Sequence, residues 1–128
     1  MKEILDKELK QIQLEILDDV AEFCKTQNIS YFLAYGTLIG AIRHNGYIPW
    51  DDDIDIAMPR PDYDRFINNY RSNSGHYEVI CHQNNQGYGL PFAKVHDTLT
   101  IMKESQYQQD LYGVYIDVFP IDASVNEQ

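Results

Sequence analysis

Basic residues are scarce in this sequence. Ten Lys and Arg stand against 20 Asp and Glu among 128 residues, which gives a formal net charge of -10. Proteins that bind nucleic acids normally present a basic surface, so the composition excludes a nucleic-acid-binding protein. The expected partner is a small molecule or a cation.

Long apolar runs and cysteine pairs are also lacking. No stretch reaches the ~18–20 apolar residues of a membrane span, and the first residues, MKEILDKELKQ, lack the apolar run of a signal peptide. Cys24 and Cys81 are isolated, which predicts reduced thiols in a cytoplasmic protein. His82 follows Cys81, but neighbouring strand residues point to opposite faces, which argues against a metal or nucleophile site at this pair.

The length and the hydrophobic content of 44% favour one globular domain spanning residues 1–128. Near the N-terminus, apolar residues recur every three or four positions, which predicts a long amphipathic helix that ends near residues 27–28. These residues are Leu5, Leu9, Ile12, Ile16, Val20 and Phe23.

The rest of the chain alternates between strand-like and helix-like segments. Proline and glycine mark many of their ends, and we expect Pro59 and Pro120 to stop the strands that they follow. The predicted strands cover residues 29–35, 53–58, 77–82, 91–95, 99–102 and 114–119, and the predicted shorter helices cover 38–43 and 61–71.

Acidic residues concentrate at positions 51–55, where four of five residues are Asp. The two-residue period of a strand puts Asp53 and Asp55 on one face and the isoleucines on the other. Two carboxylates on one rigid strand suit a hard divalent cation such as Mg²⁺ or Mn²⁺. A helix–loop–helix calcium loop is set aside, because its sixth position requires Gly and is Ile56 here.

A further Asp lies in the last predicted strand. Asp117 stands between Ile116 and Val118, so it is either an edge residue facing water or a third carboxylate beside the first two. The Asp53/Asp55 pair favours the third carboxylate. Three carboxylates on neighbouring strands can hold one or two metal ions against a phosphate.

The Gly36-Thr37 turn comes after a predicted strand and precedes a short helix. Free N–H groups at a helix start can bind a phosphate, although most Gly-Thr pairs simply cap a helix. The motifs that follow the turn favour the phosphate-binding interpretation. They are the Asp-x-Asp strand with Asp53 and Asp55, and then the strand that contains Asp117.

These motifs together resemble a known family. The segments YGTLIGAIRH (35–44), GYIPWDDDIDI (46–56) and MPR (58–60) look like the signature of the LicD family of phosphocholine transferases, and DVFPID (117–122) resembles its later motif. The resemblance implies a nucleotidyltransferase-like α/β (α+β) fold, in which a mixed sheet is flanked by helices.

The resemblance also implies a site and a reaction. Asp53, Asp55 and Asp117 would be the catalytic carboxylates and the ligands of Mg²⁺ or Mn²⁺, and Asp117 would also deprotonate the acceptor. The donor would be CDP-linked, typically CDP-choline, and CMP would leave as phosphocholine moves to a glycan hydroxyl of lipopolysaccharide or teichoic acid. Such an enzyme would work in the cytoplasm or at the inner face of the membrane, where the glycan precursor is presented.

Three further residues could contact the donor, and the sequence allows two interpretations for each of them. Arg43 either reaches a phosphate or complements the C-terminal end of its helix. Lys94 either contacts the nucleotide or extends its ammonium group to water, which is the more common role. Trp50 either packs in a loop or joins the 10 Tyr in an aromatic surface for the choline ammonium.

Family members usually continue beyond the third acidic motif, whereas this chain stops at Gln128, 11 residues after Asp117. We therefore expect a C-terminally truncated catalytic domain, and the exposed surface left behind would favour self-association. Two alternatives stay open. One is a nucleotidyltransferase that transfers NMP and releases pyrophosphate, and the other is a non-catalytic remnant that binds metal or nucleotide.

Overall fold

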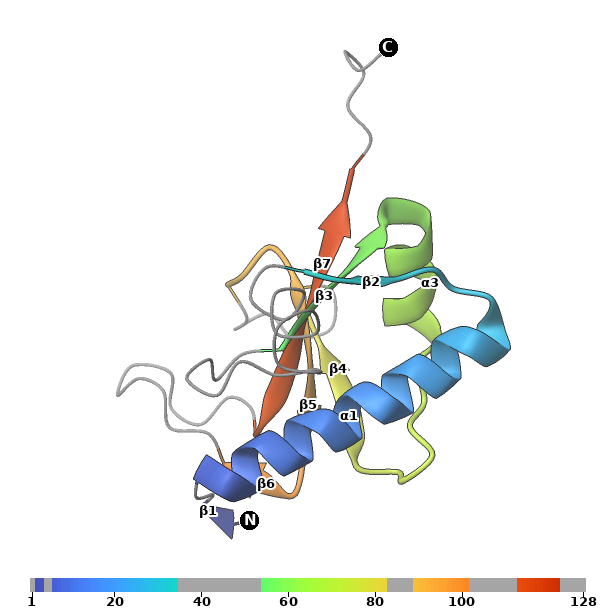
Figure 1. Ribbon diagram of the computed structural model, residues 1–128. Coiled ribbons are helices and arrows are strands. Elements are labelled where there is room, and N and C mark those ends of the chain that lie inside the picture. The colour runs from blue at the N-terminus through green and yellow to red at the C-terminus, as the bar shows by residue number, and fades with distance from the viewer. Residues whose placement is uncertain (1, 4–5, 35–53, 83–88, 102–112, 123–128) are drawn as a thin grey trace.

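The computed structural model describes residues 2–3, 6–34, 54–82, 89–101 and 113–122. Its elements include a five-stranded mixed sheet with the strand order β2-β3-β7-β5-β4 and two helices, α1 and α3 (Figure 1). A two-stranded parallel sheet joins β1 and β6. The predicted mixed sheet with flanking helices is confirmed. The bounds are β1 Lys2–Glu3, α1 Asp6–Gln27, β2 Phe32–Leu33, β3 Asp55–Pro59, α3 Arg60–Asn69, β4 Tyr77–Ile80, β5 Ala93–Asp97, β6 Thr100–Ile101 and β7 Tyr115–Ile121.

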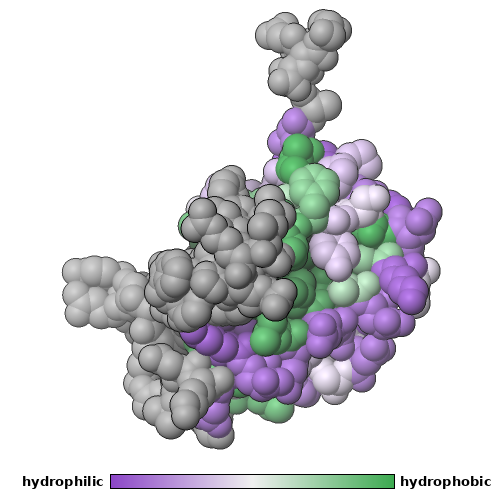
Figure 2. Space-filling model, viewed as in Figure 1, coloured by the Kyte–Doolittle hydropathy of each residue, from purple (hydrophilic) through white to green (hydrophobic). Residues whose placement is uncertain are grey.

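The first helix confirms the prediction from hydrophobic period. It ends at Gln27, and Asn28 follows with a φ of 58°, the left-handed conformation that commonly ends helices. The N–H of Ile29 then donates to the Cys24 carbonyl at 2.9 Å. The outward face of α1 is largely hydrophilic (Figure 2), so the helix buries one side only.

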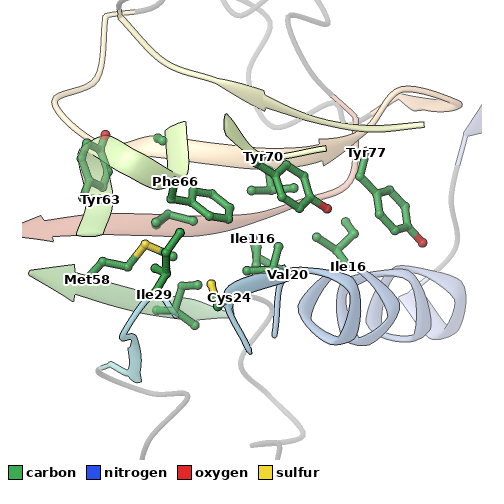
Figure 3. Close-up of a cluster of buried hydrophobic side chains, with 14 of the residues drawn as sticks. Ile16, Val20, Cys24, Ile29, Met58, Tyr63, Phe66, Tyr70, Tyr77 and Ile116 are labelled. Carbon is green, nitrogen blue, oxygen red and sulfur yellow. The ribbon is translucent and has the colours of Figure 1, made fainter. Parts of the chain in front are cut away.

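One face of the sheet carries the hydrophobic core. Ile16, Val20 and Cys24 of α1 meet Phe66 of α3 there, with side chains from the strands between them (Figure 3). The core also includes Ile54, which directly precedes β3, and the strand residues Ile56, Met58, Ala93, Val95, Ile116 and Val118. Because alternate strand residues point to opposite faces, the residues between them lie on the second face of the sheet.

Pro120 lies inside β7, so the expectation that it stops its strand is wrong, whereas β3 does end at Pro59 as expected. Pro120 pairs with Met58, and β7 runs on to Ile121. The N–H of Asp117 donates toward β3, so the N–H that Pro120 lacks would point toward β5. The pairing with β5 ends earlier, at Val118, and no ladder bond is lost.

Several boundaries differ from their predicted positions. Of the strand predicted over 29–35, the described residues 29–34 are paired at Phe32–Leu33 alone, and the helix predicted over 61–71 is α3 Arg60–Asn69. The strand predicted over 91–95 is β5 Ala93–Asp97, and β1 was missed because two residues carry no periodic pattern. The predicted helix over 38–43 lies outside the described residues.

Candidate functional site

Two carboxylates and one ammonium form a row across three neighbouring strands. In the register of the sheet, Asp55 of β3 pairs with Asp117 of β7, and Asp117 pairs with Lys94 of β5. Partners in a ladder project to the same face, so the three side chains share the second face, away from the hydrophobic core. We call this set the charged row.

Asp117 is not at an edge of the sheet. Its strand, β7, lies between β3 and β5 and is drawn in red in Figure 1. The residue is 8% exposed, so the alternative of an edge carboxylate facing water is wrong. Its backbone N–H donates to the Ile54 carbonyl at 3.0 Å, and the Ala34 N–H donates to the Asp55 carbonyl at 3.0 Å. These bonds hold the backbones of both carboxylate residues in the sheet.

Lys94 is buried beside Asp117. Its Nζ lies 2.6 Å from Asp117 Oδ1, and the residue is 4% exposed. The interpretation that this side chain extends to water is therefore wrong. An ammonium group loses its hydration when it is buried, and here an ion pair offsets that loss.

Aromatic rings flank the buried ammonium. Lys94 Nζ lies 3.7 Å from the centroid of the Tyr115 ring and 5.4 Å from that of Phe92. The Phe92 ring lies 4.3 Å from the ring of Phe119. Ring faces attract cations, so these contacts add to the ion pair in fixing the position of the ammonium group.

A pocket of about 340 Å³ is lined by residues of α3, by His82 and by the segment that leads into β5. Phe92, which contacts Lys94, is also part of the pocket wall. The other lining residues are Arg60, Tyr63, His82, Gly89, Leu90 and Pro91.

The charged row fits a hard cation in its donor chemistry. Asp55 and Asp117 offer carboxylate oxygens from adjacent strands, and such oxygens are the ligands that Mg²⁺ and Mn²⁺ prefer. Within the described ranges, no three His, Cys, Asp or Glu side chains gather in a metal-binding group. The third predicted ligand, Asp53, lies outside these ranges. So do Gly36, Thr37, Arg43 and Trp50.

The cysteines lie apart from this row. Cys24 and Cys81 form no disulfide and are buried in the hydrophobic core, while His82 is exposed. Burial, with a smaller effect of Asp62, raises the pKa of Cys24 to about 11, which keeps it a thiol at neutral pH. The two cysteines are thus not joined by a disulfide, in agreement with the prediction of reduced thiols.

Sequence reasoning missed the partners of Lys94. Two signals were available: Lys94 lies between the apolar residues Ala93 and Val95, and Tyr115 precedes Asp117 by one strand period. Neither signal shows that β5 lies next to β7, so the ion pair could not be predicted from them.

Comparison with known proteins shows which family this chain belongs to. The model of the LicD/FKTN/FKRP nucleotidyltransferase domain matches residues 28–127. The chain belongs to the LicD family. The match includes every residue of the charged row, and the resemblance drawn from the sequence motifs is confirmed.

Individual relatives of the family cover the chain to different extents. The chain is 36% identical to the lipopolysaccharide cholinephosphotransferase LicD of Haemophilus influenzae, over 99% of this chain and 48% of that protein. It is 32% identical to an uncharacterized protein of Rickettsia typhi, over 77% of this chain and 34% of that protein. It is 29% identical to mannosyltransferase regulator 4 of Saccharomyces cerevisiae, over 90% of this chain and 9% of that protein. The chain thus spans about half or less of the length of these relatives.

In the described part of the chain, no helix is both long enough and apolar enough to cross a membrane.

Proposed function

We propose that this LicD-family domain takes part in the metal-dependent transfer of phosphocholine from CDP-choline to a glycan hydroxyl of lipopolysaccharide, with CMP as the leaving product. The observation that carries the proposal is the charged row, in which Asp55, Asp117 and Lys94 lie side by side on one face of the sheet. The similarity to the lipopolysaccharide cholinephosphotransferase of Haemophilus influenzae supports the choice of phosphocholine and lipopolysaccharide. Teichoic acid is a second acceptor to test, and we place the reaction in the cytoplasm or at the inner face of the membrane.

The two described carboxylates have the role of holding the cation. Asp55 and Asp117 would bind Mg²⁺ or Mn²⁺, with Asp53 as the third predicted ligand. When bound, the metal supplies positive charge that neutralises the donor diphosphate and the leaving CMP. The role of Asp117 as the base for the acceptor hydroxyl stays a prediction.

The remaining residues would position the donor. Lys94 adds a positive charge in the row, where it can attract a phosphate. Gly36, Thr37 and Arg43 stay predicted phosphate-binding residues on the strength of the family motif.

Calorimetric titration of CDP-choline tests the donor. We expect binding to the 128-residue chain with Mg²⁺ or Mn²⁺ present and loss of binding when the metal is chelated. Absence of binding in a folded sample would argue against CDP-choline as the donor, whereas binding without turnover would favour the non-catalytic remnant.

Chemical identification of the released product separates the two reactions. In a turnover assay with the glycan acceptor, CMP would support transfer of phosphocholine. Pyrophosphate released from a nucleoside triphosphate would instead indicate NMP transfer.

Carboxylate substitutions test the site. We expect Asp55→Asn and Asp53→Asn each to lower the rate of CMP release at least ~10²-fold, because each removes one anionic ligand of the proposed cation. Asp18→Asn makes the same chemical change on the exposed face of α1 and should leave the rate near that of the parent chain. Near-normal activity of a folded Asp55→Asn variant would exclude Asp55 from the proposed ligand set.

A further inference from the structure

The charged row contains its own cation. Lys94 reaches Asp117 from β5, while Asp55 reaches the same row from β3 on the other side of β7. Asp117 is thus the central member, with an ammonium group on one side and a carboxylate residue on the other. The formal charges of the row sum to −1, so the ammonium balances the two carboxylates only in part.

Lys94 is held in place by more than its charge. Its Nζ donates to Asp117 Oδ1 at 2.6 Å and lies 3.7 Å from the centroid of the Tyr115 ring. Both Lys94 and Tyr115 are 5% exposed or less, so the ammonium cannot exchange these contacts for water without leaving the sheet face. These contacts hold the ammonium group of Lys94 beside Asp117.

A metal ion at the same row would share Asp117 with this ammonium group. Two positive charges that use one carboxylate repel each other, and the repulsion is strong in a partly buried site, where water screens it weakly. We propose that Lys94 is an internal counter-ion that competes with the divalent metal for Asp117. This inference rests on the proposed metal-dependent function.

The competition has a consequence for the transferase. Without a donor, Lys94 lowers the affinity of the row for metal. The phosphates of a bound donor bring negative charge that offsets the repulsion between the two cations. Lys94 therefore couples metal binding to donor binding, and in linked binding each ligand strengthens the other by the same factor.

The test measures binding of Mn²⁺ alone to the metal-free chain by isothermal titration calorimetry. In Lys94→Gln the amide can still donate a hydrogen bond to Asp117, but the positive charge is gone. We expect Lys94→Gln to bind Mn²⁺ at least ~10-fold more tightly than the parent chain, because the competing cation has been removed. Lys94→Arg keeps the charge and should bind Mn²⁺ as the parent does. Lys25→Met makes the same change in net charge on the exposed last turn of α1, and its affinity for Mn²⁺ should also match that of the parent.

Three results would overturn the inference, and one of them also overturns the proposed function. If the parent binds Mn²⁺ and folded Lys94→Gln binds it equally or more weakly, Lys94 supports the metal site instead of competing with it. If Lys25→Met tightens binding as much as Lys94→Gln does, net charge explains the effect. If neither the parent nor Lys94→Gln binds Mn²⁺, the metal site itself is wrong. Should Lys94→Gln fail to fold by circular dichroism, Lys94→Met replaces it, and the same outcomes apply.

Discussion

At the scale of single residues, the buried polar and charged side chains of this domain have hydrogen-bond or ion-pair partners. In the described part of the chain, every buried side-chain nitrogen and oxygen has a hydrogen-bond partner. Lys94 and Asp117 are the clearest case, because both are buried and form an ion pair. Removing one partner of such a pair leaves an uncompensated buried charge, which costs far more than the pair itself contributes.

The substitution Asp117→Asn tests this dependence. We expect the free energy of unfolding to fall by about 3–5 kcal/mol, because the Lys94 ammonium loses its counter-ion. Urea unfolding followed by circular dichroism measures the change. Asp122→Asn is the matched control, since Asp122 pairs with Arg60 at 2.6 Å on the surface, and it should change the stability much less. Equal losses in the two variants would show that burial of the pair does not matter.

At the scale of the elements, hydrogen bonds join the turn between β5 and β6 to the start of β7. The turn between β5 and β6 approaches the start of β7 closely, where the Asp97 N–H donates to the Val114 carbonyl and the Val114 N–H donates to Thr100 Oγ1. Gly113 lies directly before Val114, where these two segments come closest to each other. A Cβ there would overlap the Asp97 carbonyl oxygen and the Thr100 hydroxyl oxygen. The close packing of these elements therefore requires a residue without a side chain.

Gly113→Ala should destabilise the domain by roughly 1–3 kcal/mol, because backbone atoms must shift to admit the methyl group. Thermal unfolding of the two proteins measures the difference. Gly89→Ala is the control, because in the described part of the chain no heavy atom apart from those of the adjacent residues lies within 4 Å of a Cβ built at that position. A melting temperature that falls equally in both variants would contradict the steric explanation.

At the scale of the whole molecule, we expect the stability to depend on pH through His96, a half-buried histidine of β5. Burial lowers the pKa of His96, while Glu78 and Asp97 oppose this shift. Nδ1 of His96 accepts a hydrogen bond from the Gly113 N–H at 3.0 Å, which requires an unprotonated Nδ1. The unfolded chain has the ordinary histidine pKa near ~6.5, so it binds the proton more readily than the folded chain does.

Protonation of His96 should therefore destabilise the folded chain. The contribution of His96 to stability is present above about pH 6.5 and is lost as the pH falls through its lowered folded pKa. We expect the free energy of unfolding, measured in urea at pH values from about 7.5 down to about 5, to fall with pH. His96→Asn keeps an acceptor for the Gly113 N–H but cannot take up a proton, so its stability should fall less steeply. An unchanged slope in His96→Asn would assign the pH dependence to other groups.

The sequence predicted the long helix well because the helix has a long periodic pattern. The ends of the strands were less predictable. β2 is paired over two residues only, although residues 29–35 are rich in aromatic and β-branched side chains. Pro120 continues a strand because its neighbour has already ended, and local sequence does not show where a neighbouring strand ends.

Periodicity alone determined which face of its strand Asp55 occupies, because alternation is a local property of the backbone. The order of the motifs was enough to indicate the LicD family. Only the tertiary structure decided that β7 lies between β3 and β5, which brings Lys94 next to Asp117, 23 residues later in the chain. Strand order and register arise from pairing between distant segments and from burial of a shared core. The residue pattern within one strand therefore leaves the partner of a buried charge undetermined.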